Sequence, residues 1–495
     1  MLPGFVSRPL SRAAAYLCDK LTSPALALAR PAILSLLSSI KVGTLILIDE
    51  PLGERHIFGQ PLDEEEAAST TPGSSTTHPS SNPETTKKKK TTTTTQGTTT
   101  QDNPPPPCAT LTIKSPTFYL RLLLLSPSAD MGFAAAYLLG EATCPDLTSL
   151  FRLFILNRAH LNNMTTANGT TASWCSSSGN NNNTVANAAV NAAAHYDLGN
   201  DMFAAFLSGD MTYSCPIWRL DDDGLEGETL EEAQRRKLRR FVEGARLKSG
   251  DHVLEIGTGW GSFAIEAVKA TGCRVTTLTL SREQKVLAEE RIAAEGLAGR
   301  IEVLLMDYRA LPVPPERPYD KVVSIEMLEA VGKEFLGTYF ACVDKLLKRD
   351  GGVAMFQCIT MPEGRHEAYS RSEDFINHYI FPGGYLPSIT QLLNHISTES
   401  KGTLIVEKVE NIGGHYARTL RLWREQFIAN FEDKIRPALM KEHPDMRKNE
   451  VDVFRRKWEY YFTYCEAGFL TKTLGDVIIT VGREGAMELM EGIPL

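Results

Sequence analysis

Apolar and polar positions alternate in two separate parts of the chain, and the first part forms a short domain. In "GTLILIDEPLGERHIFGQ" (residues 43–60) the alternation on both sides of "PLGE" predicts a β-hairpin with "PLGE" as its turn. The strand pattern returns in "ATLTIKSPTFYLRLLL" (109–124), and "DLTSLFRLFILN" (146–157) has the spacing of a helix. We therefore predict a small α+β N-terminal domain formed by residues 1–61 and 108–160.

Two polar tracts interrupt the patterned segments. Residues 62–107 include "KKKKTTTTTQGTTTQ" and "PPPP" and have almost no apolar side chain to bury, which predicts a disordered low-complexity insert. A second tract, "TTANGTTASWCSSSGNNNNT" (165–184), predicts a linker over residues 161–190. The remaining residues, 191–495, then form a separate and larger domain.

In this larger domain helical and strand patterns alternate from about residue 229. Thr229 and Glu232 have the spacing of a capping box at a helix start, and the helical run "SREQKVLAEERIAAEG" ends at Gly296. The β-type runs are "HVLEIG", "RVTTLTL", "IEVLLM", "DKVVSI" and "GGVAMFQCI". This order predicts an α/β fold with a mainly parallel sheet, in which ligands bind at the carboxyl ends of the strands.

Composition limits the classes of partner. The 495 residues are 42% hydrophobic, and the net charge of -8 with a pI near 5.8 argues against nucleic acid as the main partner. Nine cysteines are scattered singly without a C-x-x-C pair, so we expect no metal site and a reducing, cytoplasmic compartment.

The N-terminus has the composition of a mitochondrial transit peptide as well. Its apolar part is interrupted by Pro24, Arg30 and Pro31, so we expect a docking or membrane-surface helix rather than a span.

One glycine-rich turn stands between a strand and a helix, in "VLEIGTGWGSF". Gly257, Gly259 and Gly261 allow the backbone to pass close to a ligand. The next strand ends in "TTLTLS", without the acid that a dinucleotide ribose requires, so NAD is disfavoured. The E-x-G-x-G-x-G form is similar to the first motif of S-adenosylmethionine-dependent methyltransferases. In "SREQ", Ser281 and Gln284 fit a capping box, which explains Gln284 as well as a cofactor contact would.

The order of several motifs resembles one family. With "HYDLGNDMF", "MTYSC", "LEIGTGWGS", "TLTLSREQ", "SIEMLEAVG", "YIFPGGYLPS" and "HYARTLRLW" in succession, the chain resembles the cyclopropane-fatty-acyl-phospholipid synthases and mycolic acid cyclopropane synthases from His195 to Gly485. The N-terminal segments resemble the small first domain of the bacterial members that act on phospholipids. The resemblance implies a Rossmann-like class I S-adenosylmethionine-dependent methyltransferase fold. Its substrate-covering helical insertions would be residues 361–388 and 454–470.

The resemblance also implies a reaction and its residues. A methylene group would pass from S-adenosylmethionine to a cis double bond of a phospholipid acyl chain at a membrane surface, through a carbocation that a bound bicarbonate deprotonates. The implied cofactor contacts are Tyr213, Ser214, Gly257, Gly259, Thr279, Leu280, Gln284 and Tyr308. The implied catalytic groups, which would hold the bicarbonate, are Glu329, Tyr416 and the main chains of Cys215 and Ile359, with Gln357 at the position of a further contact to it. Aromatic candidates for stabilising the cation are Tyr213 and Tyr416 first, then Tyr196, Phe203, Tyr379, Phe381 and Tyr385.

Departures from the family pattern keep alternatives open. Gln357 stands where bacterial members usually carry a histidine, and an amide donates a hydrogen bond but cannot become cationic, although plant-type members also have Gln. Ala330 also replaces a common histidine. Cys215 has no histidine beside it in sequence that would support a nucleophilic role. The rival functions are lipid C-methylation of the sphingolipid C9 type and an inactive lipid-binding relative, and bacterial relatives indicate a homodimer.

Overall fold

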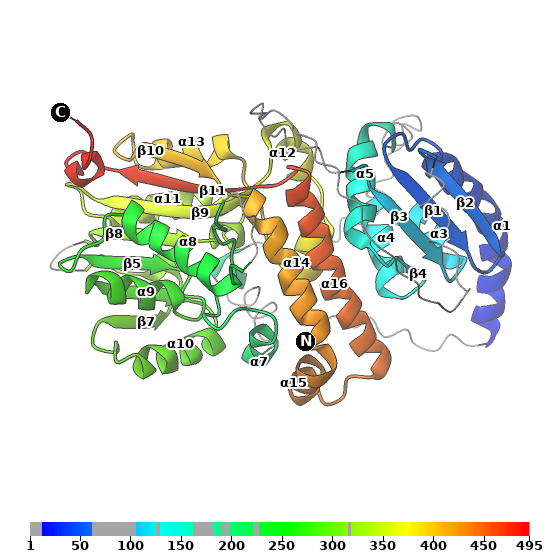
Figure 1. The fold of residues 1–495 in the computed structure, drawn as a ribbon, viewed down its shortest axis with the longest axis horizontal. Helices are drawn as coiled ribbons and strands as arrows, with labels where there is room; N and C mark the ends of the chain where they lie inside the picture. Colours follow the sequence, from blue (N-terminus) through cyan, green and yellow to red (C-terminus); the bar gives the residue numbers. More distant parts are fainter. Residues whose placement is uncertain are drawn as a thin grey trace, which may run out of the picture.

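The computed structural model describes residues 12–61, 105–124, 129–161, 183–185, 187–188, 191, 199–220, 227–314 and 318–494. Most of the predicted low-complexity insert and most of the predicted linker lie outside these ranges, as do Tyr196 and the start of the "HYDLGND" motif. The described residues form a small N-terminal domain and a large α/β domain, with two long helices between them (Figure 1).

The N-terminal domain contains a four-stranded sheet in the order β2-β1-β3-β4. Strands β1 (Thr44–Asp49) and β2 (Glu54–Gly59) form the predicted hairpin, with residues 50–53 as the turn, one position earlier than predicted. Strand β3 (Cys108–Ile113) runs parallel to β1, and β4 (Ala142–Thr143) closes the sheet. Its helices are α1 (Arg12–Leu37), α3 (Thr117–Leu124), α4 (Ala129–Leu138) and α5 (Leu147–Leu161).

Helix α1 is attached to this domain by apolar and polar contacts. Ala29 and Ile33 are buried in the domain core. The Arg30 guanidinium donates from Nε to Asp49 Oδ2 at 3.0 Å, and the Tyr119 hydroxyl donates to the same oxygen at 2.8 Å. Because Asp49 is itself buried, these two donors compensate the cost of burying its charge. No helix in the described part of the chain is long and apolar enough to cross a membrane.

The large domain is built on a seven-stranded sheet in the order β10-β11-β9-β8-β5-β6-β7. The five predicted strands are confirmed as a parallel set: β5 (His252–Ile256), β6 (Arg274–Thr279), β7 (Ile301–Leu305), β8 (Lys321–Ile325) and β9 (Val353–Thr360). Two further strands, β10 (Ile405–Asn411) and β11 (Gly475–Gly482), were not predicted. Strand β11 is antiparallel to both of its neighbours, which makes the sheet mixed.

Helices cover both faces of this sheet because its strands are apolar on both sides. Val253 packs on one face with helices α8 (Leu230–Gly244), α9 (Ser262–Thr271) and α10 (Arg282–Ala294). The next residue, Leu254, packs on the other face with α11 (Leu336–Leu346) and α13 (Ile389–Glu399). The predicted capping box at Thr229 and Glu232 is present at the start of α8. Gly296 follows α10 with a left-handed φ of 70°, as a capping glycine requires.

Helical segments inserted around the last strands connect the two domains. After β9 come α12 (Glu363–Tyr369) and η5 (Ile376–Ile380); between β10 and β11 come α14 (Gly414–Ala429), η6 (Phe431–Ile435), α15 (Arg436–Glu442) and α16 (Lys448–Leu470). Helices α14 and α16 lie between the large sheet and the N-terminal domain (Figure 1). Thr148 on α5 donates to the buried Glu466 of α16 at 3.0 Å, and Arg456 Nε donates to the Leu138 carbonyl at 2.6 Å. The short elements α7 (Asn200–Ala204), η2 (Tyr308–Ala310), η3 (Leu328–Ala330), η4 (Lys333–Phe335) and η7 (Met487–Met490) complete the described part.

Candidate active site

A cavity of about 2010 Å³ extends from the carboxyl ends of the parallel strands to the N-terminal domain. Most of the predicted site residues lie on its wall, although they come from distant parts of the chain. These are Tyr213, Ser214, Gly257, Gly259, Thr279, Leu280, Gln284, Tyr308, Glu329, Ile359 and Tyr416. Cys215 and Gln357 are completely buried just behind this wall.

The glycine-rich turn after β5 forms one end of the cavity. Gly257 has a φ of 105°, and a Cβ there would lie only 3.2 Å from the Cβ of Met327, so both its conformation and its surroundings require glycine. Glu255 at the end of β5 is buried, and its Oε2 has no hydrogen-bond partner among the described residues. Burial raises the pKa of Glu255 to about 8.

The structure separates the two roles considered for Gln284. Ser281 Oγ caps α10 by accepting a hydrogen bond from the Gln284 main-chain nitrogen at 3.2 Å. The Gln284 side chain does not complete a capping box, because its Oε1 accepts from Thr279 Oγ1 at 2.8 Å. Thr279 Oγ1 in turn accepts from the Ser281 main-chain nitrogen at 3.1 Å. The Gln284 side chain therefore belongs to the cavity wall and holds the end of β6.

The segment 211–215 crosses the cavity and is held from two sides. Before it, Asp210 accepts hydrogen bonds from the Ser208 and Thr212 hydroxyls, and Met211 has a left-handed φ of 59°. After it, the Lys237 ammonium donates to Ser214 Oγ at 2.6 Å, and Gln234 donates to the Ser214 carbonyl at 2.7 Å.

Gln234 and Lys237 are fully buried polar side chains of α8, three residues apart on one helix face. Desolvation lowers the pKa of the Lys237 ammonium. Sequence reasoning missed both residues. Their positions among the apolar residues of an amphipathic helix were the available signal.

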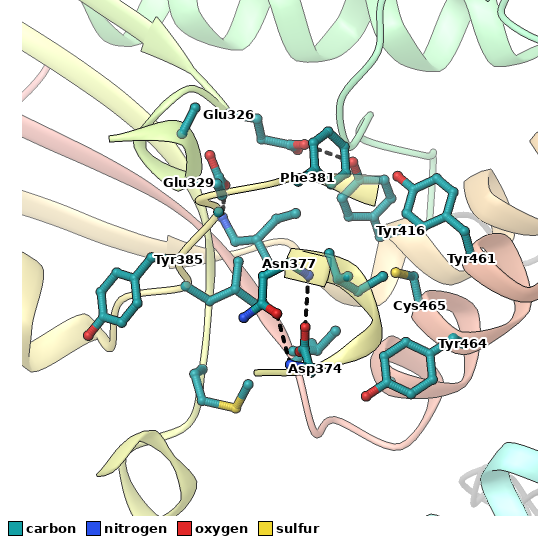
Figure 2. A pocket seen from close by; sticks show the side chains of 18 of the residues that line it. Glu326, Glu329, Asp374, Asn377, Phe381, Tyr385, Tyr416, Tyr461, Tyr464 and Cys465 are labelled. Carbon is teal, nitrogen blue, oxygen red and sulfur yellow. Dashed lines mark hydrogen bonds between the residues drawn. The ribbon is translucent and has the colours of Figure 1, made fainter. Parts of the chain in front are cut away.

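A half-buried carboxylate that the sequence analysis did not assign, Glu326, occupies the centre of the site. Its Oε1 accepts from the Cys215 main-chain nitrogen at 2.6 Å and from Gln357 Nε2 at 2.8 Å. Its Oε2 accepts from the Tyr416 hydroxyl at 2.7 Å (Figure 2). Glu326 directly follows β8, and its position at the carboxyl end of a parallel strand was a usable sequence signal.

Two further acids lie close to Glu326. Glu329 Oε1 accepts from the Ile359 main-chain nitrogen at 2.5 Å, while its Oε2 has no partner among the described residues. Burial and the negative charge of Glu326 raise the pKa of Glu329 to about 8. Asp476 on β11 accepts from Gln357 Nε2 at 2.8 Å, and burial followed by the charge of Glu326 raises its pKa well above the usual range. Glu329 and Asp476 are therefore the two neighbours of Glu326 that favour the protonated state.

This arrangement does not fit the bound bicarbonate that the resemblance implies. The donors assigned to that anion were the main-chain nitrogens of Cys215 and Ile359 and the hydroxyl of Tyr416. Each of them donates to a carboxylate of the chain itself, which is Glu326 for Cys215 and Tyr416 and Glu329 for Ile359. Gln357, assigned as a further contact, also donates to Glu326. The residues present do not fit a second anion at this point.

The Cys215 thiol does not line the cavity. It is fully buried and makes a 3.8 Å contact with the Ile412 carbonyl, and burial raises its pKa well above the usual range. A thiol that remains protonated is a poor nucleophile. The geometry therefore gives Cys215 a role through its main chain only.

Aromatic rings surround the region next to Glu326 and Glu329. The Tyr213 hydroxyl lies 2.9 Å from the hydroxyl of Tyr461, which sequence reasoning missed, and the Tyr416 ring packs 4.7 Å from Phe469. Phe381 and Tyr385 also line the cavity (Figure 2). Of the remaining predicted aromatics, Phe203 packs in the core against Trp260, and Tyr379 packs against Phe375.

The far part of the cavity is apolar and belongs to the N-terminal domain. Its wall there includes Ile33 of α1, Phe118 and Leu122 of α3, and Phe154 and Ile155 of α5. The cavity thus joins a polar glycine-turn pocket to a long apolar chamber.

Comparison with known proteins places these features in a family. The family model described as "Mycolic acid cyclopropane synthetase" matches residues 183–478. The tuberculostearic acid methyltransferase UfaA1 of Mycobacterium tuberculosis is 44% identical over 297 residues, which cover 60% of this chain and 65% of that protein. The cyclopropane-fatty-acyl-phospholipid synthase of Escherichia coli is 35% identical, covering 60% of this chain and 69% of that protein.

The chain also resembles a solved structure of the same family. The crystal structure of mycolic acid cyclopropane synthase CmaA1 complexed with SAH and CTAB superposes with a TM-score of 0.51 at 29% identity, over 60% of this chain and 98% of that chain. The expected S-adenosylmethionine-dependent methyltransferase α/β fold is thereby confirmed, with a mixed rather than a purely parallel sheet and an N-terminal extension that carries a small sheet.

Proposed function

Since the chain belongs to the mycolic acid cyclopropane synthetase family, we propose that it transfers a methylene group from S-adenosylmethionine to a cis double bond of a phospholipid acyl chain, forming a cyclopropane ring. The observation that carries this proposal is the cavity itself. One space connects the glycine turn, the carboxyl groups of Glu326 and Glu329 and an apolar chamber lined by the N-terminal domain.

The methyl donor fits the polar end of the cavity. Gly257 and Gly259 allow close approach of the backbone, and Tyr213, Ser214, Thr279, Leu280, Gln284 and Tyr308 surround the same space. When bound, S-adenosylmethionine supplies an electrophilic methyl group. The chain's own contribution is to orient the donor and the alkene in line and to exclude water, because an alkene is a weak nucleophile.

Attack by the alkene leaves a carbocation next to the aromatic wall. Rings such as Tyr213, Tyr416 and Phe381 stabilise a cation by about 0.5 to 2 kcal/mol each when desolvated. Ring closure then requires the removal of one proton from the added methyl group. The Glu326 carboxylate, which lines the same space beside Glu329, provides an acceptor for this proton.

The substrate of this reaction is a membrane lipid, so we propose peripheral association with a membrane. Leu28 on α1 is 73% exposed and lies four residues before the cavity-lining Ala32, and Leu123 on α3 is 45% exposed and itself lines the cavity. Exposed apolar side chains on the helices that line an acyl chamber favour contact with a lipid surface. The cytoplasmic or mitochondrial location stays a prediction, as does the homodimer that the resemblance implies.

The 44% identity with a tuberculostearic acid methyltransferase favours a second candidate, lipid C-methylation. Both reactions share the first step, in which the alkene attacks the methyl group. They differ in which carbon loses the proton. Loss from the added methyl group closes a ring, whereas loss from a neighbouring chain carbon leaves a methyl-branched alkene.

Expression in a bacterium that lacks cyclopropane lipids tests the proposal. We expect gas chromatography with mass spectrometry of fatty acid methyl esters to show a new species heavier than its alkene by one CH2 unit. Catalytic hydrogenation saturates a methyl-branched alkene under conditions that leave a cyclopropane intact, so it separates the two candidates. Gly257→Val is the matched negative control, because a side chain there would contact Met327. Folded protein that yields no new lipid would contradict both candidates and favour an inactive lipid-binding relative.

A further inference from the structure

The position of Glu326 is the most unusual feature of the site. Its carboxylate receives three hydrogen bonds, from the Cys215 main-chain nitrogen, the Tyr416 hydroxyl and Gln357. Those donors come from a loop, from α14 and from β9, so three separate elements converge on one side chain. Glu326 also lines the cavity, which places its carboxylate against the space proposed for the substrate.

The backbone at Glu326 adopts a conformation that L-amino acids avoid. Its φ is 46°, in the left-handed region where glycine is favoured. Strained backbone of this kind costs about 1 to 3 kcal/mol and persists where the surrounding structure enforces it, often at functional sites. Here the Glu326 main-chain nitrogen donates to the Gln357 carbonyl at 2.9 Å, so the same residue holds both the backbone and the side chain of Glu326.

The groups around Glu326 stabilise its ionised form more than the groups around Glu329 and Asp476 stabilise the ionised forms of those two acids. Glu329 accepts one hydrogen bond, from the Ile359 main-chain nitrogen, and Asp476 accepts one from Gln357 Nε2. Glu326 accepts three hydrogen bonds, and the positive charge of the buried Lys237 ammonium also stabilises its carboxylate. Burial raises the pKa of Glu326, while its donors oppose that shift. A carboxylate with a raised pKa is a stronger base than an ordinary one.

We propose that Glu326 is a built-in general base, which takes the place and the donors of an external bicarbonate in this chain. This inference rests on the proposed function. The alkene π electrons form a bond to the methyl carbon, and the C–S electron pair departs to sulfur. The Glu326 carboxylate then takes one proton from the added methyl group, and the C–H electron pair forms the last ring bond. The positive charge and the carboxylate charge are cancelled in the same step.

The decisive experiment compares turnover with and without carbonate. Purified protein, S-adenosylmethionine and vesicles of unsaturated phosphatidylethanolamine and phosphatidylglycerol are assayed in degassed, CO2-free buffer and again after addition of bicarbonate. We expect the unsubstituted enzyme to have the same rate in both. Glu326→Gln should lower kcat by about 10²- to 10⁴-fold while leaving the Kd for S-adenosylmethionine unchanged.

Glu326→Gly provides a gain-of-dependence test. It removes the carboxylate, opens space beside the donors and relieves the left-handed strain, which offsets part of the cost of leaving the three donors without the carboxylate. We expect it to be inactive without bicarbonate and to regain turnover as bicarbonate is added. Glu334→Gly, which removes an exposed carboxylate on η4, is the matched control and should show neither effect.

Two results would overturn the proposal. One is loss of the unsubstituted enzyme's activity in carbonate-free buffer with recovery on adding bicarbonate. The other is a Glu326→Gln variant that turns over at the original rate. Failure of the proposed function has a different signature, because the unsubstituted enzyme would then bind S-adenosylmethionine or lipid without forming any alkylated product in either buffer.

Discussion

At the scale of single residues, the site is a concentration of carboxyl groups at one edge of the large sheet. Glu255, Glu326, Glu329 and Asp476 lie among apolar strands, and the buried Lys237 ammonium interacts with the charges of Glu255, Glu326 and Asp476. Burial disfavours the charged form of an acid, so Glu255 and Glu329 retain protons in the folded state that they release in the unfolded state. Burial therefore determines both the protonation state of these acids at the site and the pH dependence of the free energy of unfolding.

Glu255 makes this effect measurable. Its pKa is about 8 in the folded protein against 4.5 for the free side chain, so between these values the folded state binds the additional proton. Stability is then lost as pH rises from about 4.5 to about 8 and stays low above that range. We expect Glu255→Gln to be more stable than the unsubstituted protein at pH about 9, by on the order of a few kcal/mol, and much less so near pH 5. Urea unfolding at both pH values measures the difference.

The control for this measurement is Glu290→Gln, which changes an exposed acid on α10. It should unfold like the unsubstituted protein at both pH values. An equal effect of the two substitutions would show that net charge, rather than burial of Glu255, causes the pH dependence.

At the scale of elements, helix α8 connects local sequence signals to the site. Its start is set by the capping box, and one turn later its buried face carries Gln234 and Lys237 to the segment 211–215. The capping box at Thr229 and Glu232 therefore influences the position of the segment 211–215, which precedes it in the chain. The stability of α8 should be sensitive to the Thr229 hydroxyl.

We expect Thr229→Ala to lower the free energy of unfolding by about 1 kcal/mol, because the main-chain nitrogen of Glu232 loses its acceptor at 3.2 Å. Thr229→Ser keeps a hydroxyl and should be nearly neutral. Urea unfolding of the two variants measures the difference, and equal losses would mean that the methyl group rather than the hydroxyl stabilises the helix start.

At the scale of the whole molecule, the two domains share one cavity. Helix α16 contacts the N-terminal domain through α4 and α5, so the apolar chamber is formed from both domains. A small domain attached in this way can select the acyl chain without touching the methyl donor. Changes deep in the N-terminal domain should then alter lipid turnover alone.

Ile155 and Leu156 on α5 test this division of labour. Ile155 lines the cavity, whereas Leu156 is 45% exposed on the outer side. We expect Ile155→Trp to reduce turnover of long-chain phospholipid several-fold, because the larger ring fills the chamber, with an unchanged Kd for S-adenosylmethionine. Leu156→Trp should leave both quantities unchanged. A loss of cofactor affinity in Ile155→Trp would mean that the chamber and the donor pocket are not separate.

The sequence alone determined the elements whose signals are local. The alternation in β1 and β2, the capping residues at Thr229 and Ser281 and the glycines after β5 each act within a few residues, so the pattern is sufficient to predict them. The predicted cofactor contacts lie on the cavity wall, and most of them could be predicted because they follow the carboxyl ends of predicted strands. Strands β10 and β11 escaped prediction because long helical insertions separate them from the regular alternation.

Only the tertiary structure decided which groups meet. Glu326 receives hydrogen bonds from residues 111, 90 and 31 positions away, and no local pattern records such distances. Whether a carboxylate at the end of a strand is solvated, paired or buried among donors depends on what the rest of the chain packs around it. The periodicity of side chains determined the sheet and its ligand-binding edge, and long-range packing determined that an acid of the chain, rather than a captured anion, occupies the donors there.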